Sequence, residues 1–257
     1  MSTLAPTVAS PIALDQSPAS PRLKGTLVPR TALSSAMERA MFALLDLHFN
    51  GVDWPTFQAD LSEKNWVIVL EDEEGVLRGF STLLLYRTQA PGGPVSVVYS
   101  GDTIVERAWW GSPALPRTWI QSVKQLTPMN GCSDLYWLLL TSGYRTYRFL
   151  PVFFRDFHPR FNVESSASAA MVDAIALERF GSRYDPRIGV VRFPRPQVLA
   201  PDLLEVSKGR TEDAHVRFFL ARNPGYVRGD ELVCLTRVHD DNLTPVGRRM
   251  ARSTERG

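Results

Sequence analysis

The sequence has few of the residues that build disulfide frameworks and zinc sites. Its 257 residues include two cysteines and four histidines, and neither set has the spacing of metal ligands. A surplus of one charge is also missing, because the formal net charge of +2 is too small to indicate nucleic acid as a partner. The composition therefore predicts a protein without a metal site and without a nucleic-acid interface.

The sequence also lacks a hydrophobic segment near its start. The first 20 residues contain no Lys or Arg and no sustained apolar core, which argues against a signal peptide and a transmembrane span. We therefore predict a cytoplasmic protein with no membrane partner. Residues 1–32 carry five prolines and little periodicity, so we predict a disordered leader there. The other boundaries that we predict are a main domain over 33–193, a C-terminal α/β extension over 194–246 and a basic tail over 247–257.

Apolar residues recur at two periods along the rest of the chain. Steps of three and four predict amphipathic helices, whereas alternation predicts strands. Outside the central stretch, the sequence predicts helices over 34–49, 53–61, 165–180 and 211–222, and strands over 66–70, 76–88, 188–193 and 231–238.

The central stretch, 95–160, shows the clearest order of elements. We predict a strand over 95–106, a loop over 107–112, a helix over 113–126, a strand over 134–141 and a helix over 144–160. The first strand is interrupted by Ser100-Gly101-Asp102, where the glycine indicates a bulge or a close backbone approach. The second, DLYWLLLT, is almost continuously apolar, as in a strand that is covered on both faces. Pro151 is expected to kink the last helix.

The loop after the first central strand is a candidate anion site. Ser112 can cap the next helix and Pro113 can open it, while Arg107 and Gly111 lie beside its N-terminus. Free N–H groups and the helix dipole favour a phosphate at such a position. The alternative is a plain strand-to-helix turn. Trp109 and Trp110 either wall a pocket or belong to the core.

The order of elements from Ser34 to Phe161 resembles that of the GNAT fold of acyl-CoA-dependent N-acetyltransferases. In that family a loop of the form Gln/Arg-x-x-Gly-x-Gly/Ala binds pyrophosphate, and Arg107-Ala-Trp-Trp-Gly111-Ser112 is similar, with one residue more. The resemblance implies an α/β fold of the α+β kind, with a mixed, mostly antiparallel sheet flanked by helices. It also implies acetyl-CoA or another acyl thioester as donor, without a metal, held by Arg107, Trp110, Gly111 and Ser112.

The same resemblance implies an N-acyltransferase, in which an amine attacks the thioester carbonyl. N–H groups at the bulged strand would then stabilise the oxyanion. Phe154 stands where the family has a proton-donating tyrosine, which leaves Tyr144 and Tyr147 as the nearest phenols. Glu106 and Asp102 are the candidate bases. The alternatives are a catalytically inactive module that binds acyl-CoA or a carrier protein, and an interaction domain that binds no thioester.

A small-molecule amine is the expected acceptor, and the donor is free coenzyme A or an acyl carrier protein. Arg145, Arg148 and Arg155 lie within about 100° on a helical projection, and such a basic face would suit an acidic carrier. Cys132 is a weak candidate nucleophile, because nothing in its local sequence would activate the thiol.

Overall fold

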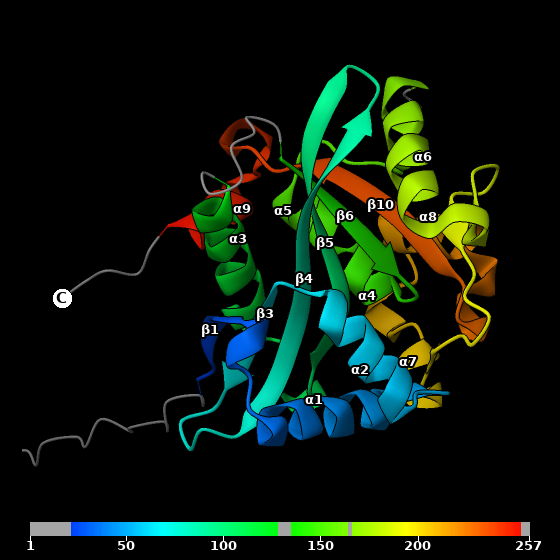
Figure 1. The fold of residues 1–257 in the computed structure, drawn as a ribbon. Coiled ribbons are helices and arrows are strands. Elements are labelled where there is room, and N and C mark those ends of the chain that lie inside the picture. The colour runs from blue at the N-terminus through cyan, green and yellow to red at the C-terminus, as the bar shows by residue number, and fades with distance from the viewer. Residues whose placement is uncertain (1–21, 128–134, 164–165, 253–257) are drawn as a thin grey trace, which may run out of the picture.

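The computed structural model describes residues 22–127, 135–163 and 166–252. They form a mixed α/β structure in which helices flank an eight-stranded sheet of order β1-β3-β4-β5-β6-β10-β8-β7 (Figure 1). Among the described strands, β5 and β6 form the single parallel pair, and the other neighbours are antiparallel. This arrangement confirms the fold class that the sequence predicts.

The first half of the sheet consists of β1 (Lys24–Pro29), β3 (Trp66–Glu71), β4 (Leu77–Ala90) and β5 (Gly93–Val105). The prediction of a disordered leader is wrong for β1, which pairs along its whole length with β3. Leu27 packs in the core on one side of the sheet and Val28 in the core on the other. Long-range pairing orders this strand despite its proline-rich neighbourhood. Residues 1–21 lie outside the described part.

The second half consists of β6 (Leu135–Thr141), β10 (Glu231–Arg237), β8 (Val190–Val191) and β7 (Tyr184–Asp185). β10 lies between β6 and β8, so the segment that was predicted as an extension supplies an inner strand of the same sheet. A short second sheet joins β2 (Phe49–Asn50) to β9 (Val198–Leu199).

Three helices cover one face of the sheet, which we call the α2 face (Figure 1). They are α1 (Ser35–His48), α2 (Trp54–Glu63) and α6 (Ser166–Phe180). The Ser34 and Asp53 side chains cap α1 and α2 by accepting backbone N–H bonds. Phe80 and Ile104 from the sheet pack in the core beneath α1 and α2.

The opposite face, which we call the α3 face, carries the largest apolar core. Its helices are α3 (Ala114–Leu126), α4 (Tyr144–Tyr147), α5 (Phe149–Phe153), α8 (Ala214–Arg222) and α9 (Pro245–Ala251), and α7 (Pro201–Leu204) lies in the connection to α8. α8 begins after Asp213, which caps it, and not at the predicted Thr211.

The predicted helix over 144–160 is wrong beyond Phe153. It divides at Arg148 into α4 and α5, and Phe154 is extended. Pro151 has no N–H to donate to a preceding carbonyl, and the chain that follows finds backbone partners elsewhere: the Arg155 and His158 N–H groups donate to Asn242 and Leu235. Phe154 and Phe157, which follow the break, are still buried.

Candidate active site

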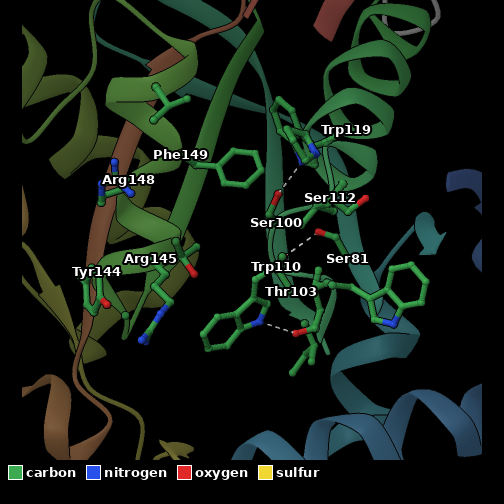
Figure 2. Close-up of a pocket in the computed structure, with 18 of the residues that line it drawn as sticks. Ser81, Ser100, Thr103, Trp110, Ser112, Trp119, Tyr144, Arg145, Arg148 and Phe149 are labelled. Carbon is green, nitrogen blue, oxygen red and sulfur yellow. Dashed lines mark hydrogen bonds between the residues drawn. The ribbon is translucent and has the colours of Figure 1, made fainter. Parts of the chain in front are cut away.

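A cavity opens where β5 and β6 separate. The two strands are paired from Ser96↔Leu135 to Ser100↔Leu139, and beyond that point neither has the other as a partner. On the α3 face this divergence leaves a cavity of about 600 Å³ between the start of α3 on one side and α4 and α5 on the other (Figure 2). Apolar side chains dominate its lining, among them Leu70, Leu115, Trp119, Trp137, Leu139, Phe149 and Val152.

The floor of the cavity carries a shared hydroxyl. Trp119 and Trp137 lie with ring centroids 4.2 Å apart, and both donate their indole N–H to Ser100 Oγ, at 3.1 and 3.0 Å. Ser100 itself is 2% exposed. A second pair of hydroxyls, Ser81 and Thr103, lies 2.7 Å apart on the same wall, and Thr103 Oγ1 also donates to the Gly101 carbonyl.

The predicted bulge at Gly101 is confirmed. Ser81 faces Thr103 and Leu83 faces Ser100, so Gly101 and Asp102 together occupy the space opposite Thr82. A Cβ on Gly101 would lie 2.6 Å from Thr82 Oγ1 and 2.7 Å from a Lys64 side-chain carbon, so only glycine fits without a shift. The bulge turns Asp102 toward the α2 face, where α2 supplies its charged neighbours.

Two carboxyl groups with raised pKa values lie on that face at the open end of the β5–β6 gap. Burial raises the pKa of Asp102 to about 7, the nearby Asp60 adds to the rise, and Lys64 opposes it. Burial likewise raises the pKa of Glu231, the first residue of β10, to about 8, with contributions from Asp102 and Asp60. A carboxyl group that titrates near neutrality is suited to accept a proton from an amine.

Glu106, the other candidate base, is engaged elsewhere. Its carboxylate lies 3.2 Å from Arg78, which also pairs with Asp72 at 2.7 Å. Neither Glu106 nor Asp102 is among the residues that line the cavity. Of the two predicted bases, Asp102 has the environment of a proton acceptor.

The predicted phosphate loop has an unexpected shortage of donors. α3 begins at Ala114, one residue later than predicted, and Ser112 Oγ accepts the Ala114 N–H at 3.2 Å. Pro113 and Pro116 have no N–H, so Leu115 is the one residue in this described first turn whose N–H remains for a ligand. The helix N-terminus is therefore a poorer anion site than the sequence pattern indicates.

The other predicted residues of the loop are divided between cavity and surface. Trp110, Gly111 and Ser112 line the cavity, whereas Arg107 is exposed and pairs with Asp202 at 3.2 Å. The Trp110 indole donates to the Val105 carbonyl at 2.8 Å, which fixes the ring at the mouth.

Arginine side chains supply the positive charge at the mouth. Arg145 lies over the Trp110 ring, 4.6 Å from its centroid, and donates to the carbonyls of Leu203 and Glu205 (Figure 2). Arg148 pairs with Asp213 at 3.0 Å, and the exposed Arg210 also lines the cavity. Arg155 does not line it, so the predicted basic helix face does not exist as one surface.

The two candidate tyrosines have different positions. Tyr144 lines the cavity, and its hydroxyl oxygen accepts the Ser207 N–H and contacts Ser207 Oγ, both at 3.2 Å. Tyr147 is fully buried outside the cavity, where its hydroxyl donates to the Pro159 carbonyl at 2.9 Å. Burial raises the pKa of Tyr147 well above its usual value. Tyr147 is therefore part of the core, and Tyr144 is the phenol at the site.

Cys132 lies outside the described residues. Cys234 is buried in β10, where desolvation raises the pKa of its thiol. In the described part of the chain, no cluster of His, Cys, Asp and Glu is arranged to hold a metal ion. No helix there has the length and apolar character needed to cross a bilayer.

Sequence reasoning missed Ser100, Lys64, Asp60 and Glu231. The signal for Ser100 was its place beside the bulge glycine. Nothing in the local sequence connects Glu231 with Asp102, because β10 reaches β6 only through the folded sheet.

No family model and no curated protein sequence matches this chain. Solved structures do match it, at low identity. The GNAT family N-acetyltransferase YhbS from Escherichia coli, in complex with CoA, is 15% identical with a TM-score of 0.37, and the match covers 51% of this chain and 70% of that one. NAA60 from Arabidopsis thaliana, in complex with a bisubstrate analogue, is 13% identical with a TM-score of 0.36. The match covers 56% of this chain and 92% of that one.

A protein from Enterococcus faecalis V583 described as a "Probable N-Acyltransferase" is 14% identical with a TM-score of 0.40. That match covers 54% of this chain, which spans a third (33%) of the Enterococcus protein. Each of these three matches covers about half of this chain.

Proposed function

We propose that the protein is an N-acyltransferase that moves an acyl group from a thioester to an amine. The observation that carries this proposal is the gap between β5 and β6, which has an apolar cavity on its α3 face and Asp102 on its α2 face. A thioester can enter from the first side and an amine from the second, so that the two meet at the gap.

The donor would lie with its acyl group and thiol-bearing arm among the aromatic and aliphatic residues of the cavity. Coenzyme A and the phosphopantetheine of an acyl carrier protein both carry phosphate next to this arm. Arg145 and Arg210 at the mouth would hold that phosphate, because guanidinium groups bind phosphate oxygens in a fork. They would replace the N–H donors that the prolines remove from the start of α3.

The acceptor amine would approach Asp102 from the α2 face. Its nitrogen attacks the carbonyl carbon and forms the C–N bond, while the π electron pair of the carbonyl moves to oxygen. When this pair returns, the C–S bond breaks and the electrons leave with sulfur as a thiolate. Asp102 would take the proton that the nitrogen loses, and the Tyr144 hydroxyl, which lines the cavity, would protonate the thiolate.

Thiol release tests this proposal. Purified protein is incubated with acetyl-CoA, hexanoyl-CoA or dodecanoyl-CoA and a panel of primary amines, and free thiol and acylated amine are measured by absorbance and mass spectrometry. We expect stoichiometric amounts of both products. Asp102→Asn should lower kcat by roughly 10²- to 10⁴-fold, in line with the loss of a general base. The matched control, Glu106→Gln, should change kcat by less than about 2-fold, because a surface ion pair contributes little.

A binding module without catalysis is the second candidate. Two observations favour it: Phe154 has no hydroxyl, and the start of α3 has few free N–H groups. Calorimetry with the same thioesters separates the two functions. Saturable donor binding with no thiol release under any amine would support the binding module and contradict the acyltransferase.

A further inference from the structure

We propose that the Ser100 hydroxyl donates a hydrogen bond to the thioester carbonyl oxygen of the bound donor and stabilises the negative charge that develops there. This inference rests on the proposed acyl transfer and assigns a residue to its oxyanion. It differs from the expectation that backbone N–H groups of the bulge provide the stabilisation.

The inference follows from the number of hydrogen bonds that one hydroxyl can make. A serine hydroxyl has one proton to donate and two lone pairs that accept. An indole N–H can only donate, so the bonds from Trp119 and Trp137 fill both lone pairs of Ser100 Oγ. The Ser100 proton is then directed away from both rings. Within the described residues, no acceptor is hydrogen-bonded to it.

The simpler explanation is that Ser100 serves only as an acceptor for two buried tryptophans. That role accounts for both indole bonds, because a buried N–H needs a partner. It does not use the Ser100 proton. The neighbouring hydroxyl pair on the same wall behaves differently. Thr103 donates to the Gly101 carbonyl and can accept from Ser81, so the Ser81 proton and the Thr103 proton each have an acceptor. An unused donor at 2% exposure is unusual, since buried polar groups are normally satisfied.

The position of Ser100 fits a carbonyl group. It is the last residue of β5 that is paired with β6, so it lies at the inner end of the gap and lines the cavity. Asp102 follows two residues later and faces the other side of the sheet, near α2. A carbonyl in the gap would have its oxygen held from the cavity side, and the attacking amine would lose its proton on the α2 side.

The surroundings would make this hydrogen bond effective. Two indole rings and several apolar side chains surround the hydroxyl, and a fixed dipole stabilises charge more strongly in an apolar medium than in water. The indole donors also polarise the Ser100 hydroxyl and hold its orientation before the substrate arrives. The serine keeps its proton throughout, so it changes neither the atoms nor the electrons of the reaction.

The test observes the carbonyl group directly. The thioester of the panel with the lowest KM is synthesised with ¹³C at the thioester carbonyl and is bound without an amine. We expect the ¹³C resonance of the complex with Ser100→Ala to lie upfield of that with the unaltered protein, because the carbonyl loses a donor. We also expect kcat to fall by about 10²- to 10³-fold, as for the removal of one oxyanion donor.

Two further variants separate this role from a structural one. Trp137→Phe removes one indole donor but keeps the Ser100 proton, so the ¹³C resonance should move much less than with Ser100→Ala. Ser100→Thr keeps the hydroxyl and should restore the resonance and most of kcat. If Ser100→Ala folds poorly, Ser100→Cys keeps the size with a weaker donor and should give an intermediate ¹³C position.

The inference is overturned if turnover is intact and the ¹³C resonance is the same with and without the Ser100 hydroxyl. It is also overturned if Ser100→Ala and Trp137→Phe move the resonance equally, since that would show a packing effect. Failure of the proposed function is a different result: the unaltered protein would then release no thiol from any thioester.

Discussion

The Lys64 ammonium lies 2.6 Å from the Asp60 carboxylate, one helical turn apart at the end of α2, and the Lys64 side chain is wholly buried. This pair sets the charge environment of Asp102, since Asp60 raises its pKa and Lys64 lowers it. Burial is the main cause of the raised pKa of Asp102, and these two charges modify it.

The rate of acyl transfer should rise with pH through the pKa of Asp102, near 7, because the base acts only when it has lost its proton. Asp60→Asn removes a negative neighbour and should lower this pKa, moving the acid limb of kcat/KM to lower pH. One acceptor amine is used throughout, so that its own ionisation is common to all profiles. An unchanged acid limb in Asp60→Asn would contradict the assignment of Asp102.

The free energy of unfolding should decrease as the pH rises from about 5 to 9, because the pKa values of Asp102 and Glu231 are raised in the folded protein. Asp102 and Glu231 hold protons in the folded state to about 7 and 8, whereas their unfolded forms lose them near 3.8 and 4.5. The folded state thus binds more protons in this range, and its stability is lost as the pH rises through the folded values.

The measurement for this second prediction is urea unfolding at pH 5.5, 7 and 8.5 at constant ionic strength. His158 and His215 have pKa values lowered by burial, so the difference between unaltered and altered protein is used to remove their contribution. The double change Asp102→Asn with Glu231→Gln should flatten the slope. A slope that persists in the double variant would place its origin elsewhere.

Arg210→Gln should raise KM for acyl-CoA by roughly 2- to 5-fold, the effect of one exposed charge contact. The same change should leave the KM of an acyl-N-acetylcysteamine thioester unaltered, because that donor has no phosphate. Arg155→Gln is the matched control, an exposed arginine outside the cavity. With an acyl carrier protein as donor, we expect Arg210→Gln to lower the rate of association with the carrier protein. This effect should become smaller at high salt. An equal increase in KM for both small thioesters would show that Arg210 does not act by binding phosphate.

Removal of residues 1–32 should lower the melting temperature by more than a few degrees. The truncation deletes β1, leaves the edge of β3 unpaired and takes Leu27 and Val28 from the two cores. Removal of residues 1–21 alone is the control and should change the melting temperature little. A leader that is disordered as far as residue 32 would give equal melting temperatures for both truncations. That result would show that β1 adds no stability.

Local signals predicted the parts of the fold that depend on neighbouring residues. The start of a helix at Asp53 and the bulge at Gly101 each need a particular side chain or its absence at one position. Such requirements can be read from the sequence because the competing conformations have a definite steric or hydrogen-bonding penalty.

Non-local pairing decided the parts that could not be predicted. The spacing of Phe154 and Phe157 suits a helix, yet both are buried in a non-helical segment. The backbone of this segment is hydrogen-bonded to Leu235 and Asn242, in and just after β10. The same applies to the site. Asp102 was a candidate from its place in the central strand, but its neighbours Asp60, Lys64 and Glu231 come from α2 and β10, and only the sheet brings them together.

The position of β10 has a consequence for biosynthesis. β6 forms one wall of the gap, and its second edge is covered by a strand that the ribosome makes almost a hundred residues later (Leu135 to Glu231). Until β10 has left the exit tunnel, this apolar strand has an unpaired edge, which is a template for pairing with other chains. Nascent chains that stop before β10 should therefore depend on chaperones and aggregate when these are absent, even though they already contain the cavity wall, the bulge and Asp102.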